Sequence, residues 1–228
     1  MFHKPLPFIV RILQSISAKV LLRSYPNYQP VFKNGKLLPG SDRDCIDRWK
    51  LIKSEITHFH GESLLDIGSA EGFYVLEAAK ELNCFSLGID ADIRRMAVAQ
   101  NQLVSEKIMP AGFLLEKIDT TSLKSIPAFD VVIFMSVLHH IMYTHGIEYS
   151  KELLKILRDK VKKVMIFEMG QSDEHKMSWA KLLPDMGENP HEWIKNFILS
   201  QGYREVVKIG ESDSYGKDRR RAIFRVVP

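Results

Sequence analysis

Short apolar runs alternate with amphipathic segments over most of the chain. The runs predict β-strands, and their nearly continuous apolar character is typical of strands buried on both faces of a parallel sheet. Between them, apolar residues recur three and four positions apart, which predicts helices. The alternation predicts an α/β fold, with helices on both faces of a doubly wound, seven-stranded, Rossmann-like sheet. The expected strands are 63–67, 85–89, 113–118, 129–135, 164–167, 204–209 and 221–227, and the expected helices between them are 73–82, 93–106, 148–158 and 190–201.

The pattern before residue 60 is different. Five apolar residues from Ile9 to Val20 lie on one helical face and have basic residues around them. Such a helix could lie on a membrane surface or pack on the domain, and we favour packing. Three prolines in 25–40 predict an ordered arm or loop, and a further helix is expected at 42–57. We therefore expect an N-terminal helical extension and arm over residues 1–58 and the main domain over residues 59–228.

Composition narrows the class of protein. The 228 residues are 45% hydrophobic and 26% charged, which is typical of a soluble globular protein. The formal net charge of +4 is mild and argues against a dedicated nucleic-acid binder. Cys45 and Cys84 offer neither a disulfide framework nor zinc-ligand spacing, so we expect a reduced, cytoplasmic protein. No apolar run is long enough to span a membrane.

The most informative segment is Ser63–Tyr74, with the sequence SLLDIGSAEGFY. A buried strand leads to Asp66, and small residues then occupy alternate positions from Gly68 to Gly72 before a helix begins. Small residues allow the backbone to approach a ligand closely. Asp90 ends the next strand, where a carboxylate can accept hydrogen bonds from both hydroxyls of a ribose. The sequence therefore indicates a nucleoside-containing cofactor.

The glycine spacing distinguishes between cofactors. A dinucleotide-binding fold uses G-x-G-x-x-G, whereas this chain has G-x-A-x-G after an acidic residue. That pattern resembles motif I of the class I S-adenosylmethionine (SAM) methyltransferases. The resemblance implies SAM as cofactor and S-adenosylhomocysteine (SAH) as product, with Asp66 near the cationic groups of the cofactor. An ordinary α/β turn is the alternative. The cofactor-binding residues expected at the strand ends are Asp66, Gly68, Ser69, Ala70, Gly72, Phe73, Asp90, Ala91, Asp119, Met135 and Ser136.

Asp119 follows the third expected strand and could receive the amino group of an adenine. The Asp-Thr-Thr-Ser sequence that it begins can instead cap a helix or turn, so this alternative stays open.

The fourth expected strand runs into a histidine-rich segment, 135–146. His139, His140 and His145 are the catalytic candidates, because an imidazole can orient or deprotonate a methyl acceptor. Capping and packing of the following helix is the alternative. No Cys, Asp or Glu cluster accompanies these histidines, so we expect no metal site. The substrate-binding candidates are Tyr143, Glu168, Arg219, Arg220 and Arg221. Glu168 follows the fifth strand and either binds substrate or pairs with a neighbouring base. The three arginines form either an anion-binding edge or a solvated basic turn.

Three segments resemble one family more closely. The segments Arg43–Arg48, Leu65–Phe73 and Ser136–Ile147 are similar to the methyltransferase part of bacterial O-antigen chain-terminating enzymes, in which a methyltransferase is joined to a kinase. The resemblance implies that Arg48 lies near the carboxylate of SAM and that the histidines lie beside the acceptor. In that family the methyl group caps a phosphate on the terminal sugar of a lipid-linked polysaccharide. No kinase sequence follows Pro228, so we expect a separate kinase or glycosyltransferase partner and leave the acceptor open.

We therefore expect a SAM-dependent methyltransferase that acts on a sugar hydroxyl or a sugar phosphate in cell-surface polysaccharide biosynthesis of the O-antigen type. A hydroxyl acceptor needs a general base, whereas a phosphate needs cationic donors. The expected location is the cytoplasm, with peripheral contact at the inner face of the membrane through the N-terminal helix. The alternatives are an RNA methyltransferase, acting on tRNA or on an RNA 5′-phosphate, and a non-catalytic SAM-binding scaffold.

Overall fold

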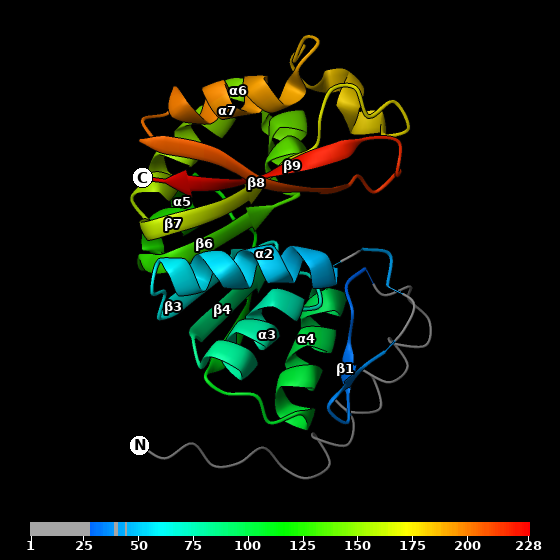
Figure 1. The fold of residues 1–228 in the computed structure, drawn as a ribbon, viewed down its shortest axis with the longest axis vertical. Coiled ribbons are helices and arrows are strands. Elements are labelled where there is room, and N and C mark those ends of the chain that lie inside the picture. The colour runs from blue at the N-terminus through cyan, green and yellow to red at the C-terminus, as the bar shows by residue number, and fades with distance from the viewer. Residues whose placement is uncertain (1–27, 39–40, 44) are drawn as a thin grey trace.

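A seven-stranded mixed sheet runs through the centre of the molecule (Figure 1). The computed structural model describes residues 28–38, 41–43 and 45–228, and the helix expected between Ile9 and Val20 lies outside these residues. The strand order is β5-β4-β3-β6-β7-β9-β8, in which the first five strands are parallel and β9 is antiparallel to both its neighbours. The strands are β3 (Ser63–Ile67), β4 (Phe85–Asp90), β5 (Ala111–Leu115), β6 (Phe129–Met135), β7 (Val161–Glu168), β8 (Glu205–Asp213) and β9 (Arg220–Val227). The predicted α/β fold with seven strands is confirmed.

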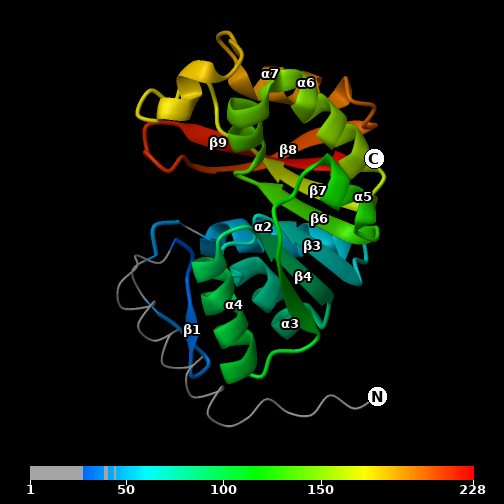
Figure 2. The same cartoon turned by 180° about the vertical axis from the view of Figure 1, so that it is seen from behind.

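Helices cover both faces of this sheet (Figures 1 and 2). A separate hydrophobic core fills each side. Alternate residues of β6 enter opposite cores: Val132 and Phe134 enter one, and Val131 and Ile133 enter the other. This division explains why the strand is apolar at every position. The first core is closed by α5 (Thr120–Ser125), α6 (Leu138–Arg158), the 3₁₀ helix η1 (Ser178–Leu182) and α7 (Pro190–Leu199). The second core is closed by α2 (Cys45–His58) and α3 (Phe73–Leu82). Helix α4 (Ile93–Ser105) lies beside α3.

Within residues 59–228, four predicted elements differ from the observed ones by three residues or more. β7 begins three residues before the expected 164–167, and β8 ends four residues after the expected 204–209. The third strand was expected at 113–118, but β5 ends at Leu115, and residues 116–118 turn away to line a cavity. The helix expected at 148–158 begins ten residues earlier, at Leu138. Gly146 interrupts it with φ 82° and ψ 174°. The first half is only two turns long and places Leu138 and Met142 in the core, and its histidines and the glycine break hide its continuity with the longer second half in the sequence.

The arm before α2 folds onto the same domain. Its two short strands, β1 (Phe32–Lys33) and β2 (Lys36–Leu37), form an antiparallel hairpin. The Gln102 side chain of α4 accepts the backbone N–H of Phe32 at 2.6 Å. The carboxylate of Glu106 accepts the backbone N–H groups of the hairpin turn. Trp49 and Ile52 of α2 pack into the core that also contains α3. The described part of the extension is therefore integrated with the sheet.

No helix within the described residues is both long enough and apolar enough to cross a membrane. Cys45 and Cys84 are buried free thiols.

Candidate functional site

A cavity of about 630 Å³ lies beyond the carboxyl ends of β3, β4 and β6. It sits where the chain order of the strands reverses around β3, which is the usual ligand position in an open α/β sheet. The structure brings ten of the predicted site residues together in its wall. These residues are Arg48, Asp66, Gly68, Asp90, Ala91, Met135, Ser136, His139, His140 and Arg221.

The glycine-rich turn forms the floor of this cavity. Its backbone is left-handed at Gly68 (φ 79°), Ala70 (φ 49°) and Gly72 (φ 83°). The N–H groups of Gly68 and Ser69 both donate to the carbonyl oxygen of Ile89, at 2.8 and 3.0 Å, so the turn is fixed against the end of β4. The predicted residues Ser69, Ala70, Gly72 and Phe73 shape the turn from below, outside the wall that the described residues form.

Asp90 is held at the end of β4 by two backbone donors. Its carboxylate accepts N–H groups from Ala70 at 2.9 Å and from Asp92 at 2.8 Å. These bonds orient both oxygens, and each oxygen retains a lone pair for a ligand. The geometry of this carboxylate suits hydrogen bonds from a pair of hydroxyl groups.

Asp66 provides a different kind of acceptor. Its side chain is 2% exposed, and Oδ2 has no hydrogen-bond partner among the described residues. Burial, and then the nearby charge of Asp90, raise the pKa of Asp66 to about 8. A buried carboxylate without a partner is costly, so this position suits a cationic donor such as an ammonium group.

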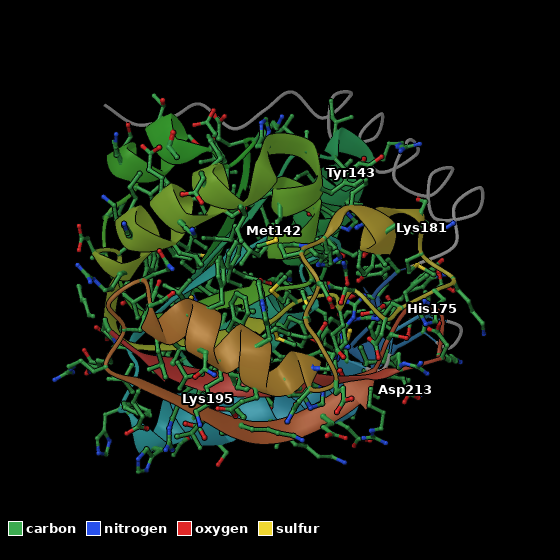
Figure 3. All side chains as sticks on the ribbon, turned by 90° about the horizontal axis from the view of Figure 1, so that it is seen from above. Met142, Tyr143, His175, Lys181, Lys195 and Asp213 are labelled. Atoms are coloured by element: carbon green, nitrogen blue, oxygen red, sulfur yellow. The ribbon has the colours of Figure 1, made fainter. Side chains whose placement is uncertain are left out.

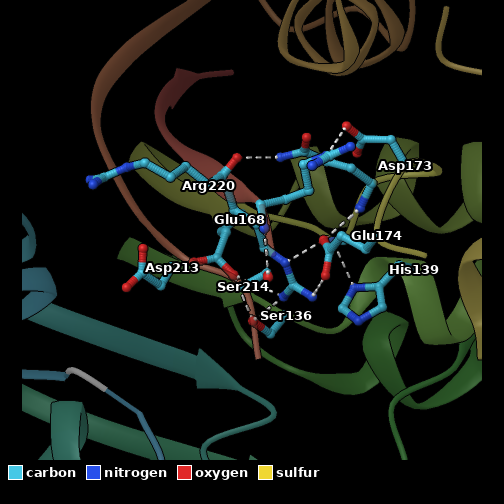
Figure 4. Close-up of polar contacts among 12 residues, drawn as sticks. Ser136, His139, Glu168, Asp173, Glu174, Asp213, Ser214 and Arg220 are labelled. Atoms are coloured by element: carbon cyan, nitrogen blue, oxygen red, sulfur yellow. Dashed lines mark hydrogen bonds and ion pairs between the residues drawn. The ribbon is translucent and has the colours of Figure 1, made fainter. Parts of the chain in front are cut away.

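A buried ionic network closes another side of the cavity (Figure 4). Glu168 at the end of β7 is 0% exposed and pairs with Arg48 at 2.8 Å, Arg221 at 3.2 Å and Arg43 at 3.3 Å. It also accepts a hydrogen bond from Ser136 Oγ at 2.7 Å. Burial alone would raise the pKa of Glu168, but the three guanidinium groups outweigh burial and lower it to about 2. Glu168 is therefore ionised, and it organises three arginines around the cavity.

The network carries one excess positive charge. Glu174, also 0% exposed, binds Arg221 through two hydrogen bonds of 2.7 and 2.8 Å. Three arginines thus face two buried carboxylates. The Nε atoms of Arg43 and Arg48 and the hydroxyl of Tyr74 have no partner within the described chain. All three side chains line the cavity, and together they suit a carboxylate or another small anion.

The three candidate histidines occupy different environments. His139 is 2% exposed, and its Nδ1 accepts the backbone N–H of Gly170 at 3.0 Å (Figure 4). Burial, followed by the charges of Arg221, His140 and Arg43, lowers the pKa of His139 well below its usual range. His140 is exposed at the rim of the cavity. His145 lies apart, on the surface of α6 with its ring against Tyr149.

Several other predicted residues also lie outside the cavity wall. Asp119 caps α5 by accepting the N–H groups of Thr121 and Ser122, both at 2.8 Å, which is the alternative that the sequence left open. Arg219 pairs with Asp173, and Arg220 with Glu211, both at exposed positions. Tyr143 is 45% exposed on α6 and lies on the side of the molecule that carries Lys181 of η1 (Figure 3).

Sequence reasoning missed the aromatic and basic residues that form the roof. The Tyr28 ring lies 4.8 Å from the Arg95 guanidinium carbon and 5.7 Å from that of Arg43, and 6.3 Å from the ring of Tyr215. These residues come from the arm, from α4 and from the β8–β9 loop, and no local motif connects them. The remaining wall residues that were not predicted as site residues are Gln29, Asp42, Cys45, Ile67, Tyr74, Ile89, Glu116, Lys117, Val137, Ile141, Met177 and Trp179.

No group of three or more His, Cys, Asp or Glu side chains among the described residues is arranged to hold a metal ion.

Comparisons with known proteins agree with this geometry. A protein-family model described as "Methyltransferase domain" matches residues 65–160. This match indicates a SAM-dependent methyltransferase, and the sheet has the strand order of the Rossmann-like methyltransferase fold. Among known enzymes the chain resembles the methyltransferase part of the Escherichia coli O-antigen chain terminator bifunctional methyltransferase/kinase WbdD.

This chain and WbdD are 29% identical over 194 residues, which are 82% of this chain and 26% of WbdD. The chain thus spans about a quarter of the length of this relative. A structure of the bifunctional kinase–methyltransferase WbdD superposes with a TM-score of 0.79 at 26% identity, covering 92% of this chain and 46% of that one. The N-terminal domain of EvdMO1, solved with SAH and D-fucose, shares the fold with a TM-score of 0.64 at 17% identity, covering 99% of both chains.

Proposed function

We propose that this methyltransferase transfers a methyl group from SAM to an oxygen of a sugar or sugar phosphate in cell-surface polysaccharide biosynthesis of the O-antigen type. One observation carries the proposal. One half of the cavity, at Asp66 and Asp90, suits a nucleoside with an amino-acid tail. The other half of the same cavity is lined by His139, His140 and Arg221. The function of WbdD as an O-antigen chain terminator and the D-fucose in the EvdMO1 structure support a sugar-containing acceptor.

The buried polar atoms of Asp66, Arg48 and Tyr74 that have no hydrogen-bond partner among the described residues fit polar groups of the cofactor. In the proposed arrangement Asp90 binds the ribose hydroxyls, Asp66 binds the ammonium group, and Arg48 with Tyr74 binds the carboxylate. Ala91 and Ile118 supply apolar surface for the adenine. When bound, SAM supplies a methyl group that its sulfonium already activates, so the protein contributes mainly proximity and alignment.

We propose that residues 59–228 form the methyltransferase domain and that residues 1–58 extend it, with the segment from Tyr28 to His58 completing the cavity. A kinase or glycosyltransferase partner and a position at the cytoplasmic face of the membrane belong to the same proposal. The free thiols of Cys45 and Cys84 are consistent with a reducing compartment. The roles of Tyr143, His145, Glu168, Arg219 and Arg220 in acceptor binding or catalysis, and of Asp119 in cofactor binding, stay predictions.

Incubation with methyl-tritiated SAM and a lysate of the source organism tests this function. The products are separated into lipid-linked glycan, RNA and small-molecule fractions. We expect label in the glycan fraction, lost with Asp90→Ala and retained with Asp159→Ala, a control at a carboxylate that is 74% exposed on the far end of α6. Label that ribonuclease removes would contradict the proposal and favour an RNA acceptor. SAH binding without label in any fraction would favour a scaffold.

A further inference from the structure

His139 and His140 are adjacent in sequence, and both line the cavity, yet their ring nitrogens are not equally available. Their rings are 4.1 Å apart, and Trp179 lies 4.3 Å from His139 and 6.0 Å from His140. The difference between them comes from residue Gly170, 31 positions along the chain, at the end of β7.

The contact with Gly170 fixes the tautomer of His139. A backbone N–H can only donate, so Nδ1 of His139 must be the acceptor. In a neutral imidazole whose Nδ1 is the acceptor, the proton is on Nε2. Its burial and the neighbouring Arg221 and Arg43 keep the ring neutral by lowering its pKa. His139 therefore has no free lone pair for a proton, and Nε2–H is a hydrogen-bond donor.

His140 has the complementary properties. Neither of its ring nitrogens has a hydrogen-bond partner among the described residues, and the ring is exposed at the cavity rim. The charged groups that face it are Arg221 from β9 and Arg95 from α4, and His139 is its titratable neighbour on its own helix. Partial burial of the ring, followed by the two arginine charges, lowers the pKa of His140. His140 is therefore neutral at physiological pH and has a lone pair available.

The charges around the cavity indicate which methyl acceptor suits it. Five basic side chains line it, four carboxylates line it, and three more carboxylates pair with its arginines. The sulfonium, ammonium and carboxylate of SAM add one net positive charge, which brings this total to −1. An anionic acceptor would add further negative charge, whereas a neutral hydroxyl would not. The basic residues are Arg43, Arg48, Arg95, Lys117 and Arg221, and the carboxylates are Asp42, Asp66, Asp90, Asp92, Glu116, Glu168 and Glu174.

We propose that the acceptor is a sugar hydroxyl, that His140 removes its proton, and that His139 positions the same oxygen by donating its Nε2–H. The proposal rests on the proposed function and narrows it. The new bond joins the acceptor oxygen to the methyl carbon, and the carbon–sulfur bond breaks with its electron pair staying on sulfur. The hydroxyl proton passes to His140. The positive charge thus moves from the sulfonium to the imidazolium, which bulk solvent then deprotonates at the exposed rim.

The tautomers can be observed without the acceptor. Protein with ¹⁵N-labelled histidine, saturated with SAH, is followed by long-range ¹H–¹⁵N NMR from about pH 5.5 to 9, with assignments from His139→Gln and His140→Gln. We expect His139 to remain the neutral Nε2–H form throughout and His140 to be neutral at pH 7 and to gain a proton only at the acidic end. An Nδ1–H form of His139, or a cationic His140 at pH 7, would overturn the assignment.

The kinetic test uses methyl-tritiated SAM and the lipid-linked glycan fraction of the source organism. We expect His140→Gln to lower turnover by about 10²–10⁴-fold and to remove the fall in rate at low pH. His139→Gln should keep that pH dependence and weaken acceptor binding, so its rate should recover at higher glycan concentration. Both variants should bind SAH within about twofold of the parent protein, which controls for folding. His58→Gln, at the exposed end of α2, is the matched control.

The chemistry of the product separates the two proposals. After acid hydrolysis we expect the tritium to remain on a neutral monosaccharide. Label recovered as methyl phosphate, or a pH dependence that survives in His140→Gln, would overturn the hydroxyl proposal alone. An absence of label from the glycan fraction, with SAH binding intact, would overturn the proposed function and this inference with it.

Discussion

Glu71 and Gln29 connect the glycine-rich turn to the arm before α2 by two hydrogen bonds. The carboxylate of Glu71 accepts the backbone N–H of Gln29 at 3.1 Å, and the side-chain oxygen of Gln29 accepts the backbone N–H of Phe73 at 3.0 Å. Glu71 also accepts the N–H of Tyr28, whose ring forms part of the roof of the cavity. The arm and the turn therefore form one unit. Glu71, at a variable position of the G-x-A-x-G motif, supplies the carboxylate that joins them.

Glu71→Gln should loosen this unit. We expect a loss of about 1–3 kcal/mol in the free energy of unfolding, because a hydrogen-bonded carboxylate at a buried position is replaced. SAH affinity should fall as well, because Tyr28 would no longer be held above the cavity. Urea unfolding and calorimetric titration with SAH measure the two effects.

Glu106→Gln is the control for this experiment, since Glu106 also holds the arm, but at its exposed hairpin. It should cost less than about 1 kcal/mol and leave SAH affinity unchanged. Equal SAH affinities for both variants would show that the arm does not support cofactor binding.

Binding of SAM should release a proton from Asp66. The pKa of this residue is about 8 in the ligand-free fold, against an ordinary value of 3.8, so the folded protein holds a proton that the unfolded chain has lost. Between these two values the ligand-free protein therefore loses stability as pH rises. An ammonium group beside Asp66 favours the ionised form, so SAM affinity should rise with pH up to about pH 8.

Calorimetry in two buffers with different ionisation enthalpies measures the proton release. Asp66→Asn should bind SAM more weakly and show no proton release in this window. Release that persists undiminished in Asp66→Asn would assign the proton to another group.

Glu168→Gln should be the most destabilising of these substitutions. It leaves Arg43, Arg48 and Arg221 buried around a neutral amide, and the loss of one partner from a buried ionic network costs about 3–5 kcal/mol. The pKa of Glu168 is lowered from 4.5 to about 2, so its contribution is fully present above pH 4.5 and is lost as pH falls towards 2. The difference between the two proteins should therefore shrink in acid.

Chemical unfolding at several pH values checks this expectation. Glu205→Gln is the control, because Glu205 forms an ion pair with Arg225 while 49% exposed and should contribute less than about 1 kcal/mol. Equal effects of the two substitutions at neutral pH would show that the network does not stabilise the fold.

Gly72→Ala and Gly35→Ala separate backbone strain from steric overlap. Both glycines have a left-handed φ, of 83° and 73°. A Cβ at Gly72 would lie 2.4 Å from Phe113 Cζ, whereas at Gly35 it would meet nothing within 4 Å. We expect Gly35→Ala to cost about 1 kcal/mol from strain, and Gly72→Ala to cost about 1–3 kcal/mol more from overpacking. Thermal unfolding compares them, and similar melting temperatures would contradict the overlap.

Local patterns in the sequence were enough to predict the sheet and the floor of the site. Buried parallel strands leave continuous apolar runs, and the turn after β3 needs small residues within a few positions of one another. The ionic network leaves no such trace, because Arg48 and Glu168 are far apart in sequence and pair only after folding. His139 and His140 are likewise indistinguishable by sequence, since the N–H that separates their roles belongs to Gly170, just after β7.

The break at Gly146 divides α6 into a part that bears His139 and His140 and a part that packs Leu153 and Leu157 into the core. A φ of 82° with a ψ of 174° is accessible to almost no residue except glycine. The first half also contributes Leu138 and Met142 to the core. We expect exchanges at the exposed positions of 138–145, made together with exchanges at the exposed positions of 171–189, to change acceptor choice with little loss of folding yield, provided that Gly146 is kept.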